Sequence, residues 1–318
     1  MGPWLRLLRP GDWTKNVFVL VPAVFWLSGE GRSHDLAEEF AQRFPPLMWT
    51  FAAFCLAASG SYCVNDVLDA SKDRTHPVKR SRPVASGQVG PGPAVVVGLL
   101  LQASAIAIVF AMPGKVVGAC LLAYVLLQVA YNLRLKRVPL VDVSVLATGF
   151  CLRAAGGAAA MDVRLSIWLL LCVFFLTLFL GFTKRLCDLS AAENARAAGQ
   201  SVDWRARPGY ETRDQMNWLL GVSGSLVVML YLSYTLSQHA RSLHGVRALG
   251  MAVLTPLVMI AIHRFYRRAN LGESDAPLET LRNDRTLLAC MVLFAVGTGV
   301  ALFGGPRVEG LLGRLLLQ

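Results

Sequence analysis

Three aspartates with helical spacing lie in a charged segment that directly follows a long apolar run. Asp66, Asp69 and Asp73 are three and four residues apart, so we expect them on one helix face, with Asn65 one turn from Asp69. Stacked carboxylates repel each other, and a divalent cation reverses this repulsion. Mg²⁺ prefers oxygen ligands and often shares one or two carboxylates with substrate phosphates. The spacing therefore predicts a Mg²⁺ site formed by these four residues, and a solvated acidic helix end is the alternative.

A second polar group of residues follows a later apolar run. Lys184 and Arg185 are followed by Asp188 and, further on, by Glu193. Lys184 and Asp188 are four residues apart, so a local ion pair is one interpretation. The functional interpretation is that Lys184 and Arg185 hold a phosphate, while Asp188 contacts a second metal, a sugar hydroxyl or a partner cation. Because this group follows the sixth apolar run and the aspartates follow the second, the recurrence indicates two halves that face each other.

The elements that position these residues are apolar. Of the 318 residues, 55% are hydrophobic and 16% are charged, and the mean hydropathy is +0.50, values typical of a membrane protein. Nine runs carry few or no charges: 16–29, 44–64, 89–112, 116–133, 138–161, 165–183, 216–238, 248–262 and 286–306. A spanning helix needs about 20 apolar residues, so the first and eighth runs must either borrow flanking residues or lie in a thinned bilayer. We expect an all-α membrane protein with nine transmembrane helices and a single domain over residues 1–318.

The distribution of basic residues predicts the orientation. With nine spans, 22 of the 31 lysines and arginines fall on the side of the N-terminus and the aspartate segment, and eight fall on the other side. This asymmetry predicts that the N-terminus and the aspartates lie in the cytoplasm, in a multi-pass protein of the inner (plasma) membrane. Attraction to anionic headgroups and phosphorylated substrates explains the net charge of +11, so no nucleic-acid partner is expected. The seven cysteines form no CxxC pair, which predicts neither a disulfide framework nor a zinc site.

Two ionisable residues interrupt the fifth apolar run. Asp142 and Arg153 are 11 residues apart, which places them roughly 16 Å apart along a helix, too far for a direct ion pair. An ionisable side chain at this depth is a functional hypothesis by default. Either Arg153 reaches phosphate groups or it pairs structurally with another helix, and both interpretations stay open.

The charged motifs resemble those of a known family. The pattern Asn65-Asp66-x-x-Asp69-x-x-x-Asp73-Arg74, with the later Arg82-Pro83-x-Ala85-Ser86-Gly87, is similar to the first aspartate-rich motif of the UbiA superfamily of intramembrane prenyltransferases. Within it, the chain most resembles the branch that transfers phosphoribose to a polyprenyl phosphate. Three further motifs carry this likeness: Arg9-Pro10-x-x-Trp13-x-Lys15-Asn16, Tyr131-Asn132-Leu133-Arg134-Leu135-Lys136 and Lys184-Arg185-x-x-Asp188.

The resemblance implies a fold, a reaction and a set of site residues. The fold is a UbiA-type bundle of two four-helix halves plus one helix. In the reaction, a polyprenyl (decaprenyl) phosphate displaces pyrophosphate from phosphoribosyl pyrophosphate, and Mg²⁺ assists the leaving group. The catalytic residues implied are Asp66, Asp69, Asp73 and Asp188. The substrate-binding residues implied are Lys15, Asn16, Arg74, Lys79, Arg82, Tyr131, Arg134, Lys184 and Arg185.

One departure from the superfamily bears on the substrate. Aromatic prenyltransferases of this kind carry a second Asp-x-x-x-Asp motif after the sixth span, whereas here Asp188 is followed four residues later by Ala192. This argues for phosphoribosyl transfer over the alternative, transfer of a prenyl group from a prenyl diphosphate to an aromatic or other small acceptor. A transporter is a third interpretation, which predicts polar residues at the membrane midplane. The sequence leaves lipid chain length and oligomeric state, including a homo-oligomer, open.

Overall fold

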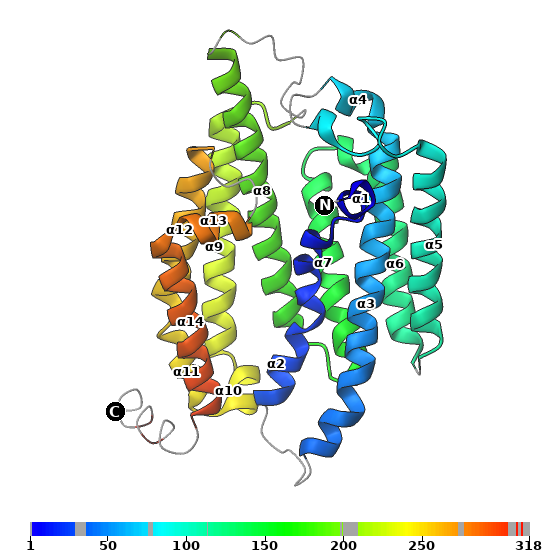
Figure 1. The fold of residues 1–318 in the computed structure, drawn as a ribbon. Coiled ribbons are helices and arrows are strands. Elements are labelled where there is room, and N and C mark those ends of the chain that lie inside the picture. The colour runs from blue at the N-terminus through cyan, green and yellow to red at the C-terminus, as the bar shows by residue number, and fades with distance from the viewer. Residues whose placement is uncertain are drawn as a thin grey trace. The chain divides into compact units, whose positions relative to one another are not determined.

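The computed structural model describes residues 2–28, 36–75, 79–112, 114–197, 199, 209–272, 277–304, 310 and 313. Every regular element among these residues is a helix (Figure 1). Eight helical segments are long and apolar enough to cross a membrane. The predicted all-α membrane class is therefore confirmed, whereas the count of nine spans is not.

The chain forms two compact units. Residues 1–26 and 32–166 belong to the first, and residues 27–31 and 167–318 belong to the second. Each unit contains four of the eight candidate spans, which agrees with the two four-helix halves predicted from the sequence. The prediction of a single domain over residues 1–318 stays a prediction.

The helices of the first unit have the following bounds: α1 (Pro3–Leu8), η1 (Pro10–Val19), α2 (Val21–Ser28, in this unit up to Trp26), α3 (Leu36–Leu68), α4 (Ala70–Arg74), η2 (Lys79–Ser81), α5 (Pro91–Phe110), α6 (Lys115–Leu133), η3 (Leu135–Arg137) and α7 (Val141–Ala160). The helices of the second unit are α8 (Ile167–Ala197), α9 (Arg213–Leu236), α10 (Gln238–His244), α11 (Arg247–Ala252), α12 (Thr255–Asn270), α13 (Pro277–Asn283) and α14 (Arg285–Phe303).

Of the two short apolar runs, only the eighth forms a candidate span. The first is divided between the 3₁₀-helix η1 and the eight-residue α2, and neither alone reaches the roughly 20 residues of an α-helical span. The eighth run joins α11 and α12 into one candidate span, 247–270, which borrows basic flanking residues as the sequence predicted. The count of nine therefore depends on η1 and α2, and no apolar pattern reveals the 3₁₀ geometry of η1.

Small residues bring the helices of the first unit close together. Helices α3 and α5 lie side by side, and a Cβ atom on Gly60 of α3 would lie 2.6 Å from the carbonyl oxygen of Gly98 on α5. A Cβ atom on Gly157 of α7 would lie only 1.9 Å from the carbonyl oxygen of Val19 in η1. Both contacts require glycine, because a real Cβ atom does not approach backbone this closely.

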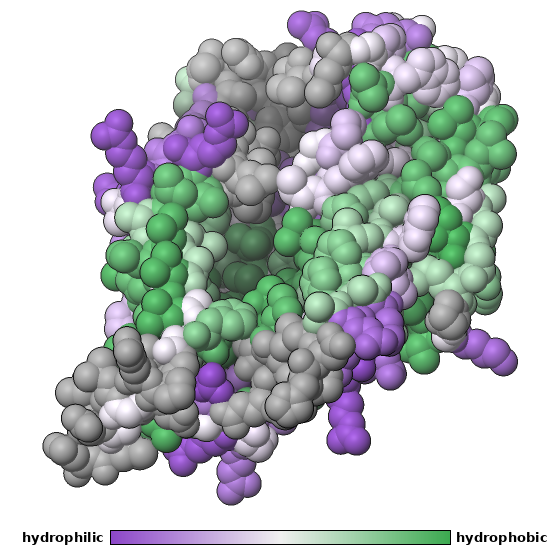
Figure 2. Space-filling view, turned by 60° about the horizontal axis from the view of Figure 1, so that its bottom comes forward, coloured by the Kyte–Doolittle hydropathy of each residue, from purple (hydrophilic) through white to green (hydrophobic). Residues whose placement is uncertain are grey.

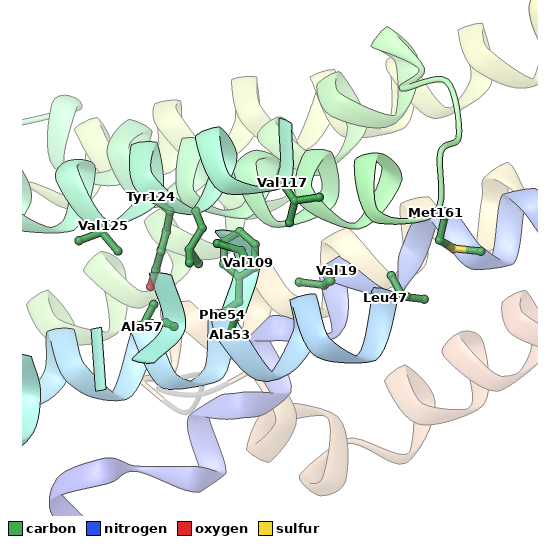
Figure 3. Close-up of a cluster of buried hydrophobic side chains, with 12 residues drawn as sticks. Val19, Leu47, Ala53, Phe54, Ala57, Val109, Val117, Tyr124, Val125 and Met161 are labelled. Carbon is green, nitrogen blue, oxygen red and sulfur yellow. The ribbon is translucent and has the colours of Figure 1, made fainter. Parts of the chain in front are cut away.

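A cluster of buried apolar side chains fills the space between these helices. Figure 3 shows Val19, Phe54 and Val117 in this cluster, with Tyr124 extending from α6 toward Ala57 of α3. These side chains are almost fully buried. The cluster fixes α3 and α6 relative to η1, which matters because α3 and η1 adjoin the charged segments that carry the predicted site.

The outer faces of the helices are hydrophobic. Large apolar side chains such as Leu100 of α5, Met229 of α9 and Val296 of α14 are more than half exposed. Figure 2 shows hydrophobic side chains over the viewed flanks of the helices and hydrophilic side chains near their ends. Exposed apolar surface of this kind is expected where helices face lipid.

Candidate active site

The predicted helix of aspartates continues beyond the apolar span, although it is divided in two. Helix α3 ends at Leu68, Asp69 is the N-cap residue, and α4 begins at Ala70. The helical hydrogen bonds persist across this break, because the Asp69 amide donates to the Asn65 carbonyl (2.9 Å) and the Asp73 amide donates to the Asp69 carbonyl (2.8 Å). The predicted spacing is therefore kept by two closely linked helices rather than one.

Asp66 and Asp73 are joined by one arginine. Arg82 Nη1 lies 2.7 Å from Asp73 Oδ2 and 3.4 Å from Asp66 Oδ1. A second cation, Arg9 from the junction of α1 and η1, lies 2.5 Å from the same Asp66 oxygen. The Asp66 side chain is fully buried beneath these two guanidinium groups. The guanidinium of Arg9 also lies 5.0 Å from the ring centre of Tyr62, a cation–π contact.

Asp69 has a different partner. Lys136 Nζ, from η3 after α6, donates to Asp69 Oδ1 at 2.7 Å and to Asn65 Oδ1 at 3.3 Å. Each of the three aspartates is therefore matched by a cation from another segment of the first unit. The predicted carboxylate repulsion is relieved in this structure by protein cations.

The Arg82 loop is held by its apolar residues. Pro83, Val84 and Ala85 are buried, and the Ala85 carbonyl accepts a hydrogen bond from Arg74 Nε at 3.3 Å. Gly87 has a φ of +77°, a backbone conformation that side chains other than glycine rarely adopt. The Arg-Pro-x-Ala-Ser-Gly pattern therefore forms a fixed turn that directs Arg82 at two carboxylates.

The donor set suits a hard divalent cation. Among the described residues no group of three or more His, Cys, Asp or Glu is arranged to hold a metal. However, Asp66 Oδ2 is buried and has no hydrogen-bond partner in the described part of the chain. An unpaired buried carboxylate oxygen is costly, and it is also a ligand that Mg²⁺ prefers. The residues therefore fit a metal at Asp66, provided that the surrounding cations rearrange.

The other predicted residues of the first unit have varied surroundings. Lys15 is half-exposed and pairs with Asp12 at 2.7 Å, and Lys79 and Arg134 are exposed. Tyr131 is partly buried near the end of α6. The roles of these four predicted residues in substrate binding stay predictions. His76, for which the sequence suggests either a base or a residue that shapes the turn, lies outside the described residues.

Asn16 is buried in a polar network that also contains Arg153. Arg153 donates from Nε to Asn16 Oδ1 (2.6 Å), from Nη2 to the Tyr124 hydroxyl (3.0 Å) and from Nη1 to the Gly149 carbonyl (2.9 Å). Asn16 Nδ2 in turn donates to Cys55 Sγ at 3.2 Å. Of the two interpretations left open for Arg153, these contacts favour the structural one, since its acceptors are neutral protein groups on other segments and on its own helix.

The second predicted group of residues lies on α8 of the second unit. Arg185 is buried and its Nη1 lies 3.5 Å from Asp188 Oδ2, whereas Lys184 is exposed. The predicted local ion pair joins Lys184 to Asp188, and the ion pair described here joins Asp188 to Arg185, three residues away. Glu193 pairs with Arg213 of α9 at 2.7 Å.

Asp284, a third carboxylate of this unit, is held by two arginines. Asp284 accepts from Arg264 and Arg268 and from the Leu287 amide, so it also caps α14. Burial would raise the pKa of Asp284, but these hydrogen bonds outweigh it and lower the pKa to about 2. The carboxylate is therefore ionised and structural.

The sequence did not predict two side chains that pair with the aspartates, Arg9 and Lys136. Both lie in motifs that carried the family resemblance, but their pairing with Asp66 and Asp69 requires α1 and η3 to approach the end of α3. Three adjacent carboxylates signal that cations must lie nearby. The sequence contains 31 lysines and arginines, so this signal alone does not identify which of them they are.

The fold and the site define a class: a multi-pass helical membrane protein with a charge-paired aspartate cluster where a span ends. The sequence profile described as the UbiA prenyltransferase family matches residues 19–283. The chain belongs to this family.

Two relatives carry the same name. The chain is 31% identical over 287 residues to the decaprenyl-phosphate phosphoribosyltransferase of Corynebacterium glutamicum, covering 89% of this chain and 81% of the relative. It is 30% identical over 305 residues to the protein of that name from Mycolicibacterium smegmatis, covering 94% and 92%. Sequence similarity therefore extends along almost the whole chain.

Solved structures share the fold. A UbiA homologue from Archaeoglobus fulgidus bound to GPP and Mg²⁺ has a TM-score of 0.64 at 18% identity, over 95% of this chain and 99% of that one. A digeranylgeranylglyceryl phosphate synthase has a TM-score of 0.61 at 13% identity, over 95% and 98%. These likenesses confirm the predicted UbiA-type fold.

Proposed function

We propose that this protein transfers 5-phosphoribose from phosphoribosyl pyrophosphate to a polyprenyl phosphate, with decaprenyl phosphate as the expected acceptor. The observation that carries the proposal is the aspartate cluster with its ring of cations, which suits a metal-bound pyrophosphate. The names of the relatives supply the acceptor and the transferred group. The lack of a second aspartate pair after Asp188 supports this reaction over prenyl transfer to an aromatic acceptor.

In this reaction, a phosphate oxygen of the lipid forms a bond to the anomeric carbon of the ribose, and the bond from that carbon to the pyrophosphate oxygen breaks. The lipid phosphate is already anionic near neutral pH, so no general base is required. Bound Mg²⁺ would neutralise charge on the leaving pyrophosphate. Asp66, Asp69 and Asp73, with Asn65, are the residues that would hold it.

The remaining task of the protein is to position charges. A buried turn holds Arg82 at Asp66 and Asp73, and this supports a role in which Arg82 binds the pyrophosphate oxygens as they gain charge. Arg74 and Lys79 follow the same aspartates and would contribute further charge. Binding the donor in one orientation and stabilising its leaving group would provide most of the acceleration.

In this proposal Lys184 binds the 5-phosphate of the ribose. Asp188 binds a ribose hydroxyl or a metal. Lys184 is the better test residue, because Arg185 is buried and its replacement would disturb α8. Lys184→Ala should weaken binding of phosphoribosyl pyrophosphate by roughly 10- to 150-fold, the value of one charged hydrogen bond. Asp188→Asn should impair turnover more than Asp188→Glu, which retains the carboxylate.

The test is a reconstitution of the reaction. Purified protein in neutral-lipid nanodiscs is incubated with Mg²⁺, phosphoribosyl pyrophosphate and decaprenyl phosphate, and lipid-linked phosphoribose is measured by mass spectrometry. Chelation of the metal should abolish product formation. Asp66→Asn should lower turnover by orders of magnitude, whereas the exposed Asp214→Asn on α9 should retain it. Failure of the wild type, with consumption of a prenyl diphosphate and an aromatic acceptor instead, would establish the alternative reaction.

We also propose that the aspartates face the cytoplasm of a cell whose inner membrane contains the protein. The asymmetry of lysines and arginines supports this orientation. Ser81 is exposed in η2, close to the site in sequence. In a cysteine-free background, Ser81→Cys should react with an impermeant maleimide in inverted vesicles and not in intact cells. Labelling of intact cells would reverse the orientation.

A further inference from the structure

Arg9 holds an unusual position among the cations of the aspartate site. Its Nη2 atom lies 2.5 Å from Asp66 Oδ1, a short contact in which the carboxylate side chain is fully buried and Arg9 is one-quarter exposed. Arg82 already supplies a guanidinium to the same oxygen at 3.4 Å. One oxygen of Asp66 therefore faces two cations, while the other, Oδ2, is buried with no hydrogen-bond partner among the described residues.

The backbone of Arg9 is held on both sides. Leu7 before it is fully buried against Cys63 and neighbouring apolar side chains. Ser59 of α3 donates to the Leu8 carbonyl at 2.8 Å and accepts from Trp13 Nε1 at 3.0 Å. Since the segments before and after Arg9 are fastened to α3, the movable part of this residue is its side chain.

Arg9 also adopts a costly backbone conformation. Its φ of 50° and ψ of 57° lie in the left-handed region, where a residue other than glycine, asparagine or aspartate is uncommon. The bend separates α1 from η1 and points the chain so that Arg9 reaches Asp66. A strained position occupied by arginine, where glycine would cost less, indicates that the side chain is needed there.

A divalent cation on Asp66 and the guanidinium of Arg9 oppose each other. Both are positive and both use the same carboxylate, so each lowers the affinity of that carboxylate for the other. A pyrophosphate group changes the balance, because it presents anionic oxygens that accept bidentate hydrogen bonds from arginine. The partly exposed Arg9 side chain can then leave Asp66 without losing an anionic partner.

We propose that Arg9 is an exchange cation: it neutralises Asp66 as an ion pair and moves to the pyrophosphate of the substrate when a divalent metal binds Asp66. Arg9 thereby couples metal binding to pyrophosphate binding, so that the metal alone binds weakly and the two together bind well. The inference rests on the proposed function only for the identity of the anion. It makes Arg9 a substrate-contacting residue in addition to those predicted from the sequence.

The test uses full-length protein in neutral-lipid nanodiscs, with Mn²⁺ as the metal and inorganic pyrophosphate as the anion. Free Mn²⁺ is measured by electron paramagnetic resonance in the wild type, in Arg9→Gln and in Arg6→Gln. Arg6 is the matched control, because it lies on the preceding helix α1 and its side chain bonds to Gln88. Without pyrophosphate, Arg9→Gln should bind Mn²⁺ about tenfold more tightly than the wild type, since a hydrogen bond between charged groups no longer competes.

With Mn²⁺ present, the same variant should bind pyrophosphate about tenfold more weakly, and Arg6→Gln should match the wild type in both experiments. Tighter Mn²⁺ binding together with weaker pyrophosphate binding distinguishes exchange from simple damage to the site, because damage weakens the binding of both ligands. Arg9→Lys, which keeps a charge but not the fork of donors, should show the same signs with smaller changes, and it serves if Arg9→Gln does not fold. Unchanged or weaker Mn²⁺ binding in these variants overturns the proposal.

The outcomes also separate this inference from the proposed function. If phosphoribosyl transfer fails while the opposite effects on Mn²⁺ and pyrophosphate are seen, the reaction is wrong and Arg9 exchange stands. If transfer succeeds and Arg9→Gln leaves Mn²⁺ affinity unchanged, the reaction stands and the exchange is wrong.

Discussion

Replacing Arg153 by methionine tests whether this buried cation is a structural member of the fold or a phosphate ligand. Methionine has a similar length and fits a helix, but it has no charge and no donor. The substitution removes three hydrogen bonds, to Asn16, Tyr124 and Gly149, and a cation–π contact in which the guanidinium lies 4.4 Å from the Tyr124 ring centre.

The contacts of Arg153 contribute different amounts to the free energy of unfolding. The Tyr124 hydroxyl still accepts from Gln128 at 3.0 Å, so it keeps a partner. Asn16 is fully buried, and its carbonyl oxygen would lose the 2.6 Å bond from Arg153, at a cost of about 1–3 kcal/mol. The desolvated cation–π contact adds about 2 kcal/mol. Relief from burying a charge offsets part of this, so we expect a net destabilisation of about 1–3 kcal/mol.

The assay is unfolding in detergent, combined with steady-state kinetics of the proposed transfer. Arg153→Met, Asn16→Leu and the double variant form a cycle, whose coupling should be about 1.5–3 kcal/mol because the two side chains bond directly. Gln128→Met is the control, since it removes a neutral hydrogen bond from the same tyrosine and should cost only about 1 kcal/mol. In Arg153→Met, the KM for phosphoribosyl pyrophosphate should stay within about twofold of the wild-type value. Unchanged stability with a KM raised about tenfold or more would refute the structural interpretation and favour a phosphate contact.

Three further predictions follow from single contacts. Lys136→Gln should lower turnover about tenfold or more, because Asp69 and Asn65 lose the side chain that fixes them. Gly157→Ala should destabilise the protein by about 3 kcal/mol or more in detergent unfolding, because the new Cβ atom would lie 1.9 Å from the Val19 carbonyl. Asp284, whose pKa is lowered to about 2 from an ordinary value near 3.9, should stabilise the fold fully above about pH 4 and lose this contribution as the pH falls toward 2. Asp284→Asn should lack this acid-dependent loss in unfolding midpoints measured from about pH 6 to pH 2.

Each of the three has an outcome that contradicts it. Arg137→Gln, an exposed neighbour of Lys136, should keep near-normal turnover, and equal losses in both variants would show a general effect of positive charge. Gly221→Ala has open space around its new Cβ atom, so an equal loss of stability there would remove the steric argument for Gly157. For Asp284, an acid-dependent loss of the same size in the wild type and in Asp284→Asn would assign the effect to other carboxylates.

The apolar runs predicted most of the fold, because a membrane span is encoded locally. Eight candidate spans coincide with eight of the runs, and the span of the eighth run includes flanking residues. The first run is the exception. In the structure this segment packs on α7, where Val19 approaches Gly157, and a contact between residues 138 positions apart is contained in no local pattern.

The sequence predicted which residues form the candidate site, but it did not predict which cation pairs with which aspartate. The spacing of Asp66, Asp69 and Asp73 survives in the structure, since the helical hydrogen bonds continue through Asp69. A helix model, however, treats the three carboxylates as one stack facing one ion. The structure divides them, with Asp66 and Asp73 on Arg82 and Asp69 on Lys136, because cations from other segments approach from different directions.

The origin of those cations has a consequence for how the site forms. Arg9, Arg82 and Lys136 come from the N-terminal segment, from the loop after α4 and from the turn after α6. A buried carboxylate is stabilised by its charged partners, so the burial of Asp66 depends on the packing of α1 on α3, which brings Arg9 to it. Charge pairing at the aspartates therefore depends on the same helix packing that gives the first unit its apolar core. Variants that loosen that packing, Gly157→Ala among them, should impair metal binding even though they lie far along the chain from every aspartate of the cluster.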